Sequence, residues 1–541
     1  MNQLFYGDNL QVLRESIKDE SVDLIYLDPP FNSKRDYNLL FKSPKGQRSE
    51  AQITAFEDSW HWAEQAEAEF HEILRQSNTD VAEMMKALRS FLGENDMMAY
   101  LTMMANRLLE LHRVLKRTGS LYLHCDPTAS HYLKIVLDSV FGKEHFINEI
   151  VWKRTSTHST AKGCGPVHDV IFFYSNSNQY LWNAQYDLHR TDERLRHDLS
   201  LDAKGRKFRL SDMTGAGTRN GSSGQPWRGF HPTTIGRHWI TTIEKLDILA
   251  SQGKVRFSND GKWPRLIKYQ DESLGRAIGD VWDTIPPINS SAQERLGYPT
   301  QKPLALLERI IAASSNPGDV VLDPFCGCGT AVHAAQKLKR KWIGIDITCL
   351  AIGLIEKRLK DAFKDKCKFE VHGTPKDLES ARDLAERDKY QFQWWAVTLI
   401  DAQPYQGKKK GADGGIDGLK FFYDVADTVA RKIVVSVKGG DLKADDVRAL
   451  NHVRDREKAD IAILVSLREP TAGMKKDAAS AGFFEWQAGG KKSPRVQLLT
   501  IEGLLSGVQR AEHPDYEPNV NFKKARREKG NAPAADLFEG N

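Results

Sequence analysis

The segment from Val320 to Asp346 constrains the fold more than any other part of the chain. It reads as an apolar strand, VVLD, followed by a turn that contains Gly327 and Gly329, a helix, and a second strand, KWIGID. Glycines let the backbone approach a bound ligand where a Cβ would be in the way. In nucleotide-binding α/β folds, an acidic residue about 20 positions after such glycines binds the ribose hydroxyls, and Asp346 stands at that spacing. The segment therefore predicts an α/β fold with a cofactor site beside a parallel strand.

The same turn narrows the class of cofactor. The dinucleotide fingerprint requires a third glycine, and Val332 stands in its place. Enzymes that transfer hydride from a dinucleotide are therefore disfavoured. S-adenosylmethionine has no pyrophosphate and does not need that glycine, so the turn favours S-adenosylmethionine as the cofactor.

Strand-like and helical stretches alternate along residues 1–360. Apolar strands such as VDLIYL and SLYLHCD are separated by helical stretches, the longest at residues 95–115. This alternation is typical of a doubly wound, mostly parallel sheet. A new β-rich pattern follows a charged stretch. We therefore expect a linker at 361–387, a second α/β domain at 388–511 and a disordered basic tail at 512–541.

The composition is that of a soluble globular protein. A length of 541 residues suggests two or three domains, and 40% hydrophobic with 28% charged residues argues against wholesale disorder. The net charge of +5 is compatible with a local basic channel but does not identify a nucleic acid partner. No apolar run approaches the roughly 20 residues that cross a bilayer. The six cysteines are too sparse for disulfides or a zinc site, so we expect a cytoplasmic protein.

A second motif, Asp28-Pro29-Pro30-Phe31, directly follows the apolar strand VDLIYL. An exocyclic base amine is a poor nucleophile because its lone pair is delocalised into the ring. An acceptor on each amine hydrogen frees the lone pair, and the Asp28 carboxylate and the Pro29 carbonyl can be those acceptors. Proline fixes φ, so Pro29 and Pro30 stiffen the loop, and Phe31 offers an apolar face on which a flipped-out base can stack. The motif predicts methyl transfer to a base amine.

With both motifs in one chain, residues 6–359 closely resemble the β-class of amino DNA methyltransferases, which includes the modification subunits of type III restriction systems. The resemblance implies a circularly permuted Rossmann-like fold in which the catalytic half precedes the cofactor half. It implies four catalytic residues: Asp28, Pro29, Pro30 and Phe31. It also implies a set of cofactor-binding residues: Asp8, Thr300, Gln301, Lys302, Asp323, Phe325, Gly327, Gly329, Thr330 and Asp346.

Within that set the resemblance implies separate roles. Asp8 would accept from the adenine amine of the cofactor, residues 300–302 would contact its methionine end, and Asp346 would bind the ribose. Two departures from the family pattern are the cysteines at 326 and 328 and an Asp, rather than Glu, at 346. Neither removes a group that the chemistry needs.

The resemblance also implies the substrate. Asp at position 28 indicates adenine N6 as the target, with cytosine N4 as the alternative. The irregular segment 180–297 would be the target-recognition region, and it holds side chains suited to phosphates and base edges: Arg206, Arg209, Arg219, Arg228, Arg237, Trp227, Phe230 and His231. We therefore expect double-stranded DNA as substrate, a restriction-modification system as the setting, and a second copy or a restriction subunit as partner. Modification of RNA or of protein amides, and a DNA-binding module without catalysis, are the rival readings.

Residues 391–505 resemble the Mrr-type restriction endonucleases. In that family carboxylates hold Mg²⁺ and a lysine positions the attacking water. The resemblance implies Asp417 as a metal ligand and Lys438 as the lysine, with Asp413 or Asp424 as further carboxylates. Ser436 departs from the pattern, because the family has an acid or an amide there. An active Mg²⁺-dependent nuclease, an inactive DNA-binding remnant and a structural module all stay open.

Overall fold

The computed structural model describes all of the chain except residues 31–34, 43–47, 59, 157–162, 188–199, 258–262, 270, 273–275, 290–291, 297, 299, 406–413, 425–429, 488–489, 515–527 and 529–541. For residues 35–58 and for Arg276 it describes the backbone alone. The chain divides into two compact units. One comprises Met1–Asn183 with Asp280–Asn541, and the other comprises Ala184–Gly279.

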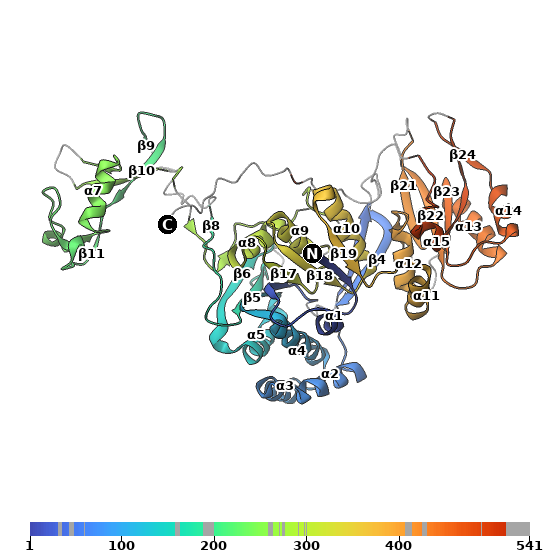
Figure 1. Ribbon diagram of the computed structural model, residues 1–541, viewed down its shortest axis with the longest axis horizontal. Helices are drawn as coiled ribbons and strands as arrows, with labels where there is room; N and C mark the ends of the chain where they lie inside the picture. Colours follow the sequence, from blue (N-terminus) through green and yellow to red (C-terminus); the bar gives the residue numbers. More distant parts are fainter. Residues whose placement is uncertain are drawn as a thin grey trace. The chain divides into compact units, whose positions relative to one another are not determined.

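A nine-stranded sheet forms the centre of the first unit (Figure 1). The strands lie in the order β16-β6-β7-β5-β2-β17-β18-β1-β19. Neighbours are parallel except around β7, which runs antiparallel to both β5 and β6, so the sheet is mixed. The strands are β1 (Asn2–Tyr6), β2 (Val22–Leu27), β5 (Leu115–Cys125), β6 (Phe146–Lys153), β7 (His168–Ser175), β16 (Val281–Trp282), β17 (Val320–Asp323), β18 (Lys341–Asp346) and β19 (Phe369–His372).

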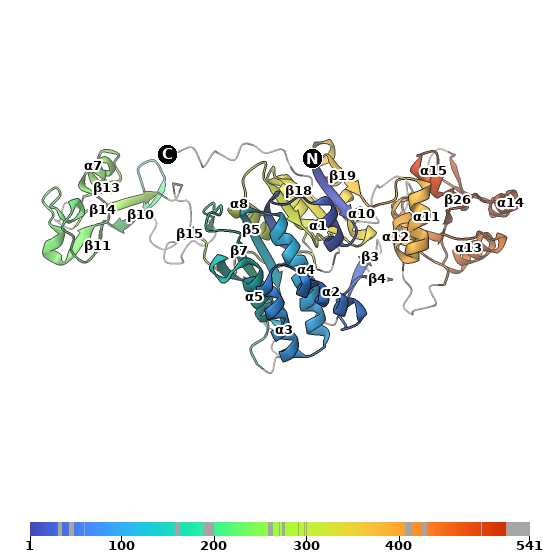
Figure 2. The ribbon, with the colours of Figure 1, turned by 60° about the horizontal axis from the view of Figure 1, so that its bottom comes forward.

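Helices cover both faces of this sheet (Figures 1 and 2). α1 and α5 both pack against α4 on one face, and α8 packs against α9 on the other, where α10 also lies. Their bounds are α1 (Asn9–Ser16), α4 (Asp96–Val114), α5 (Pro127–Phe141), α8 (Leu304–Ser314), α9 (Thr330–Lys337) and α10 (Cys349–Phe363). Layers on both faces bury nearly all residues of the central strands β2, β7 and β17, which explains their continuous rather than alternating hydrophobic pattern.

The helix expected at residues 95–115 is α4. Asn95 caps it by accepting a hydrogen bond from the amide of Met98, which is a preferred use of asparagine at a helix start. Leu101, Met104 and Leu108 are fully buried at helical spacing in the core between α4 and the sheet. No described helix is both long and apolar enough to cross a membrane.

Residues 43–80, which lack a clear sequence pattern, contain regular structure. β3 (Arg35–Lys42) and β4 (Arg48–Asp58) form an antiparallel hairpin, and α2 (Glu64–Arg75) and α3 (Thr79–Leu92) form a helical pair beside α4 (Figure 2). These helices bury Phe70 and Ile73 on α2 and Met85 and Leu88 on α3. Their outer faces are polar, so the hydrophobic pattern is weak in the sequence.

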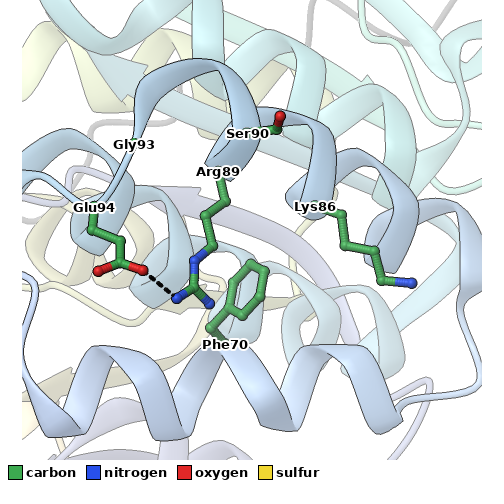
Figure 3. A pocket seen from close by; sticks show the side chains of 6 residues that line it. All are labelled: Phe70, Lys86, Arg89, Ser90, Gly93 and Glu94. Carbon is green, nitrogen blue, oxygen red and sulfur yellow. Dashed lines mark hydrogen bonds and ion pairs between the residues drawn. The ribbon is translucent and has the colours of Figure 1, made fainter.

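The surface of this helical pair is hollowed around Arg89 (Figure 3). The hollow has a volume of about 570 Å³. The Arg89 guanidinium lies 4.7 Å from the ring centroids of Trp62 and Phe70 and pairs with Glu67 and Glu94. Since these contacts engage the cation within residues 62–94, the hollow is a packing feature of the helical pair and its flanking residues.

The second unit is small and mostly antiparallel. β13 (Val255–Arg256), β14 (Arg265–Tyr269), β10 (Lys207–Asp212) and β9 (Ser200–Leu201) form its main sheet in that order. Its core contains Met213, Trp227, Trp239 and Leu246, the last from α7 (Ile243–Ser251). Short pairs complete it: β8 (Tyr186–Asp187) with β15 (Arg276–Ala277), and β11 (Thr214–Ala216) with β12 (Arg237–Trp239).

The C-terminal part of the first unit is built on a second sheet. β20 (Gln403–Pro404), β21 (Gly418–Phe422), β22 (Arg431–Lys438), β23 (Ile461–Ser466) and β26 (Val496–Thr500) lie in that order. Its helices are α11 (Leu378–Arg387), α12 (Lys389–Thr398), α13 (Ala444–Arg456), α14 (Ala472–Ser480) and α15 (Ile501–Leu505), and β24 (Phe483–Glu485) pairs with β25 (Lys492–Pro494).

The stretch 361–387, expected to be a linker, is structured. It contains β19, which extends the nine-stranded sheet beside β1, and all of α11. Four residues of strand between charged neighbours give little hydrophobic signal, which explains why the sequence pattern does not predict β19. Of the expected tail, only residues 512–514 and Glu528 lie within the described part of the chain.

Candidate active site

Three carboxylates stand at one edge of the nine-stranded sheet. Asp28 directly follows β2, Asp323 ends β17 and Asp346 ends β18. These three strands are parallel neighbours, so their carboxyl ends meet at the same edge. In open α/β sheets ligands bind at this edge. The fold therefore brings together the two halves of the site that the sequence presents far apart.

Asp28 has one engaged oxygen and one unengaged oxygen. Its Oδ2 accepts a hydrogen bond from the Lys302 ammonium over 2.5 Å. Its Oδ1 is buried and has no hydrogen-bond partner among the described residues. Pro29 is buried, Pro30 is half-buried, and Phe31 lies outside the described residues. A buried carboxylate oxygen without a partner costs free energy, so it is suited to receive a donor from a ligand.

The glycine turn after β17 has the backbone that its residues predict. Gly327 and Gly329 both have positive φ, at +50° and +73°. A Cβ on Gly329 would lie 2.7 Å from Cγ1 of Ile355 on α10, so α10 packs directly on the turn. Asp323 is buried below the turn and accepts from the amide of Phe325 over 3.1 Å. Burial raises the pKa of Asp323 well above its usual range, and the neighbouring carboxylate of Asp28 adds to the rise.

Asp346 is bonded to the glycine turn. Its Oδ2 accepts from the amide of Gly327 over 2.8 Å, and its Oδ1 accepts from the amide and the hydroxyl of Thr348, both over 2.9 Å. Burial raises the pKa of Asp346 to about 6, even though these hydrogen bonds oppose the rise. A carboxylate has about four acceptor positions, so Asp346 retains capacity for one further donor.

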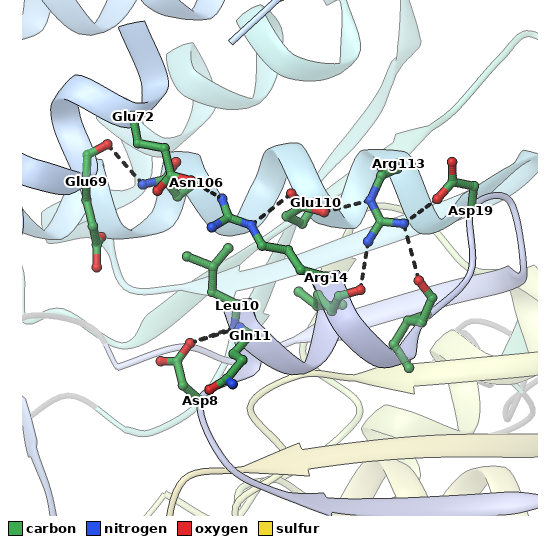
Figure 4. A network of polar contacts seen from close by, with 12 residues as sticks. Asp8, Leu10, Gln11, Arg14, Asp19, Glu69, Glu72, Asn106, Glu110 and Arg113 are labelled. Carbon is green, nitrogen blue, oxygen red and sulfur yellow. Dashed lines mark hydrogen bonds and ion pairs between the residues drawn. The ribbon is translucent and has the colours of Figure 1, made fainter. Parts of the chain in front are cut away.

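Asp8 is held by α1 and by a buried arginine. Its Oδ1 accepts from the amides of Leu10 and Gln11 at the start of α1 (Figure 4). Its Oδ2 accepts from Arg107 over 2.9 Å. Arg107 also donates to Asn9 over 2.6 Å. The motifs in the sequence do not indicate Arg107. Its position within the apolar run of α4 could have done so, because an arginine that is buried there needs a partner for its charge.

The N-terminal residues around Asp8 contact the glycine turn and the end of β18 directly. The Asn9 side chain donates to the carbonyl of Pro324 over 2.9 Å, and the amide of Gly7 donates to the carbonyl of Asp346 over 3.0 Å. The residues on both sides of Asp8 are therefore hydrogen-bonded to Pro324 at the glycine turn and to Asp346 at the end of β18.

Tyr298, Thr300 and Gln301 contact their own loop and the glycine turn, and the expected role of residues 300–302 at the cofactor stays a prediction. Gln301 holds its own loop, because its side chain accepts from the amide of Leu296 and donates to the carbonyl of Glu294. Thr300 offers its carbonyl to Lys302 at 3.5 Å. Tyr298 is buried against the glycine turn, and a Cβ on Gly327 would meet its ring at 3.2 Å.

A second buried arginine supports the turn from α10. Arg358 donates to the carbonyl of Cys328 over 3.0 Å and to the hydroxyl of Thr330 over 3.1 Å. It is 4% exposed, so its charge is removed from water at the back of the turn. Thr330 therefore fixes the turn through its side chain. The sequence offered no signal for Arg358 beyond its position in an amphipathic helix.

The residues at this edge fit S-adenosylmethionine. The positive-φ glycines keep side chains away from the space beside Asp346, where a ribose would lie. The buried Oδ1 of Asp28 can accept from an amine brought next to the cofactor. Phe325 is half-buried at the same turn.

The five arginines expected to contact DNA differ in their partners. Arg206 pairs with Asp271 and Glu272, Arg228 pairs with Asp247, and Arg237 donates to Thr214. By contrast, Arg209 and Arg219 form no ion pair with a described residue. Trp227 is buried in the core of the unit, Phe230 packs against this core, and His231 is exposed at its surface.

The C-terminal site differs from the expected metal site. Oδ2 of Asp417 accepts from the amide of Val437 over 2.7 Å and from the hydroxyl of Ser436 over 3.2 Å. Lys438 pairs with Asp446 on α13 over 3.0 Å. Asp424 is buried and accepts from the amide of Gln487. Asp413 lies outside the described residues, and no group of three or more His, Cys, Asp or Glu within the described residues is arranged to hold a metal ion.

The expectation of Mg²⁺ at Asp417 is therefore not supported, and Ser436 supplies the physical reason. Where the nucleases have a second acid or amide facing the metal, this chain has a hydroxyl that donates to Asp417. The carboxylate is thus used inside the protein. A hard cation such as Mg²⁺ needs several oxygen ligands, and a single internally bonded carboxylate does not provide them.

The mixed α/β sheet and its carboxylate edge define a methyltransferase-like fold, and comparison with known proteins identifies the family. Residues 22–357 match the model of the N6/N4 DNA methylases, described as DNA methylase, so the chain belongs to this family. This confirms the resemblance to amino DNA methyltransferases. Residues 392–506 match the model of the NACHT-associated inactive Restriction Endonuclease 1. The second α/β domain is thus like a restriction endonuclease, of a family described as inactive.

Individual relatives agree with the family. The Type II methyltransferase M.EcaI of Enterobacter cloacae is 37% identical over 261 residues, which cover 48% of this chain and 57% of that protein. The StyLTI Mod subunit, from a type III restriction-modification enzyme of Salmonella typhimurium, is 25% identical over 352 residues, covering 63% and 50%. The chain thus spans little more than half the length of these two relatives.

A shorter match and one solved structure complete the comparison. The DNA adenine methyltransferase YhdJ of Escherichia coli is 51% identical over 81 residues, covering 15% of this chain and 27% of that protein. The M1.HpyAVI–SAM complex has 15% sequence identity and a TM-score of 0.30, covering 66% of this chain and 99% of that one.

Proposed function

We propose that this protein transfers the methyl group of S-adenosylmethionine to N6 of adenine in double-stranded DNA, at a specific sequence and within a restriction-modification system. The proposal rests on membership of the DNA methylase family and, within the site, on Asp28. The single observation that carries it is the buried Oδ1 of Asp28, which has no partner among the described residues.

The chemistry of the amine requires such an oxygen. Asp28 Oδ1 accepts one amine hydrogen and the Pro29 carbonyl accepts the other, which draws the nitrogen lone pair out of the ring. Because the site edge is buried, these hydrogen bonds act without competition from water and are stronger than in solution. When bound, S-adenosylmethionine supplies an activated methyl group, so the chain needs no covalent nucleophile.

We assign the cofactor to the edge formed by Asp8, the glycine turn and Asp346. Asp346 would accept from a ribose hydroxyl with its remaining acceptor position, and the positive-φ glycines would admit the ligand. Asp8 would accept from the adenine amine with an acceptor position that neither Arg107 nor α1 uses. Asp323, with its raised pKa, would serve as a hydrogen-bond donor or acceptor without adding charge.

Adenine N6 is favoured over cytosine N4 by the acid at position 28 and by the similarity to a DNA adenine methyltransferase, YhdJ. The family includes methylases of both N6 and N4, so cytosine N4 is the second candidate. Sequencing that distinguishes the two marks decides between them.

We further propose that the unit Ala184–Gly279 is the target-recognition region. Arg209 and Arg219, which make no ion pair within the described residues, are its candidates for contacts to DNA. The fold would be a circular permutation, because β2 and Asp28 precede β17, β18 and the cofactor turn in the chain. The C-terminal domain would bind DNA or support the first domain without cutting, since Asp417 is bonded to its own sheet.

The test uses the full chain and DNA of mixed sequence with tritiated S-adenosylmethionine. The proposal expects tritium in DNA and none in RNA or protein, and it expects N6-methyladenine on digestion to nucleosides. Label in RNA or protein alone would contradict the proposal. N4-methylcytosine in the digest would support an amino DNA methyltransferase and show that its target base is cytosine instead of adenine.

A further inference from the structure

Lys302 is the residue that contacts Asp28 most closely, although the sequence pattern assigns it to the cofactor. Its ammonium lies 2.5 Å from Asp28 Oδ2 and 3.5 Å from the carbonyl of Thr300, and the residue is only 9% exposed. The two residues are 274 positions apart in the chain. Lys302 directly precedes Pro303, the N-cap of α8, so the start of that helix limits where the ammonium can reach.

The ion pair uses one oxygen of the carboxylate and leaves the other unengaged. A carboxylate can rotate about its Cβ–Cγ bond, and its two oxygens are equivalent until a neighbour distinguishes them. The Lys302 ammonium makes this distinction by binding Oδ2, which leaves Oδ1 as the buried oxygen without a partner among the described residues. Lys302 therefore determines which oxygen is presented at the site and in which direction.

A second buried carboxylate, Asp169 on β7, contributes negative charge near the pair. Asp169 is 2% exposed; it pairs with Arg154 over 3.0 Å and with His124 over 3.1 Å, and His124 contacts the hydroxyl of Tyr26 on β2 over 3.0 Å. Although burial acts to raise the pKa of Asp169, its bond to His124 and the charges of His124, Lys302 and Arg154 together lower it. Asp28 is therefore the carboxylate that contacts Lys302 directly, and Asp169 is a buried anion with its own partners.

We propose that Lys302 is a positioning residue for methyl transfer, which acts by orienting Asp28 and not by binding the cofactor. This inference rests on the proposed function, because it concerns how Asp28 receives the target amine. The physical reason is that transfer depends on hydrogen-bond acceptors held in place before the amine arrives, and a misplacement of about 1 Å can lower the rate by about 10²-fold.

The proposal differs from a cofactor-binding role in what it predicts for Lys302→Met, which keeps the length of the side chain and removes its charge. We expect kcat at saturating S-adenosylmethionine and DNA to fall about 100-fold. We expect the Kd for S-adenosylmethionine, measured by calorimetry without DNA, to stay within about twofold. Lys302→Arg, which keeps the charge and the donors, should recover at least about tenfold of the lost kcat.

The matched control is Lys341→Met, which removes an exposed lysine at the start of β18. Asp346 and the proposed site lie at the other end of that strand. It should leave both kcat and Kd unchanged. Loss of kcat in this control would show that any lysine-to-methionine change in the sheet disturbs the enzyme.

A measurement that needs no activity tests the pair itself. Melting temperatures of Asp28→Asn, Lys302→Met and the double variant form a cycle, and a buried pair predicts that the double variant is less destabilised than the sum of the two single variants. Additive changes in melting temperature would show that Asp28 and Lys302 do not interact. That result would overturn the proposal regardless of what the protein methylates. If the cycle shows coupling, a weakened Kd with unchanged kcat would overturn it in favour of a cofactor-binding lysine. Failure of the proposed function is a separate outcome, because it is read from the wild type alone.

Discussion

The amide of Gly327 donates a hydrogen bond to Oδ2 of Asp346 over 2.8 Å. This bond joins the two ends of the pattern that predicts a cofactor site, the glycine turn and the acid of the next strand. Because the turn and the acid are fixed to each other, the shape of the cofactor edge depends on the ionisation of Asp346.

Cofactor affinity should therefore depend on pH. The pKa of Asp346 is raised to about 6 by burial, so the carboxylate takes up a proton as the pH falls through 6 and loses acceptor capacity for the ribose. We expect the Kd for S-adenosylmethionine, measured by calorimetry, to rise by about tenfold per pH unit below 6 and to be flat between pH 7 and 8. Asp346→Asn should bind weakly and without this pH dependence. A pH dependence that persists in Asp346→Asn would assign it to another group.

Arg107 should support cofactor binding through Asp8 and Asn9. Arg107→Met removes both hydrogen bonds and leaves Asp8 without its cation, so we expect Kd for S-adenosylmethionine to rise about tenfold, in line with roughly 1.5–3 kcal/mol for a charge-assisted hydrogen bond. Arg14→Met is the matched control, because Arg14 on α1 pairs instead with Glu72 on α2 and Glu110 on α4, away from Asp8 (Figure 4). Equal effects of the two changes would argue against a role for Arg107 at the site.

The glycine turn should tolerate no side chain at position 329. Gly329→Ala combines a strained positive φ with a Cβ 2.7 Å from Ile355, so we expect a loss of about 1–3 kcal/mol in unfolding free energy and weaker cofactor binding. Gly318→Ala also has a positive φ, at +94°, but its Cβ would meet nothing within 4 Å. Denaturant titration should show the smaller loss for Gly318→Ala, with normal cofactor affinity. Equal losses would mean that backbone strain alone explains both.

The C-terminal domain should neither bind Mg²⁺ nor cut DNA. Asp417→Ala removes the acceptor for Val437 and Ser436, so we expect a lower melting temperature for that domain. Addition of Mg²⁺ should leave the melting temperature of the wild type unchanged. A Mg²⁺-dependent rise in melting temperature that disappears in Asp417→Ala, together with plasmid cleavage, would restore the metal site that the geometry does not support.

Much of the site could be predicted from sequence because its residues follow strands. Asp28, Asp323 and Asp346 each come at the end of an apolar run, and parallel strands bring such ends to one edge of a sheet. The family resemblance assigned Lys302 to the cofactor, which stays a prediction, and did not indicate its ion pair with Asp28. That pair depends on how the loop after β2 packs against the segment before α8. The same limit applies to Arg107.

The sequence does not predict other elements because they are short or have polar outer faces. β19 has only four residues, and the pair α2 and α3 has a polar outer face, so neither gives the periodic signal that identified α4. In the C-terminal domain, Ser436 marked the departure from an active nuclease in the sequence itself. The structure adds the reason, since the hydroxyl at that position donates to Asp417.

If Asp28 presents one oxygen to a base amine of DNA, its loss should abolish methylation in the cell. Long-read sequencing compares DNA from a host that expresses the full chain with DNA from a host that expresses Asp28→Asn. We expect N6-methyladenine within one recognition sequence for the wild type and none for the variant, whose purified protein still binds S-adenosylmethionine with near-normal affinity. Unmodified DNA from the wild-type host, or the same mark in both hosts, would contradict this role of Asp28.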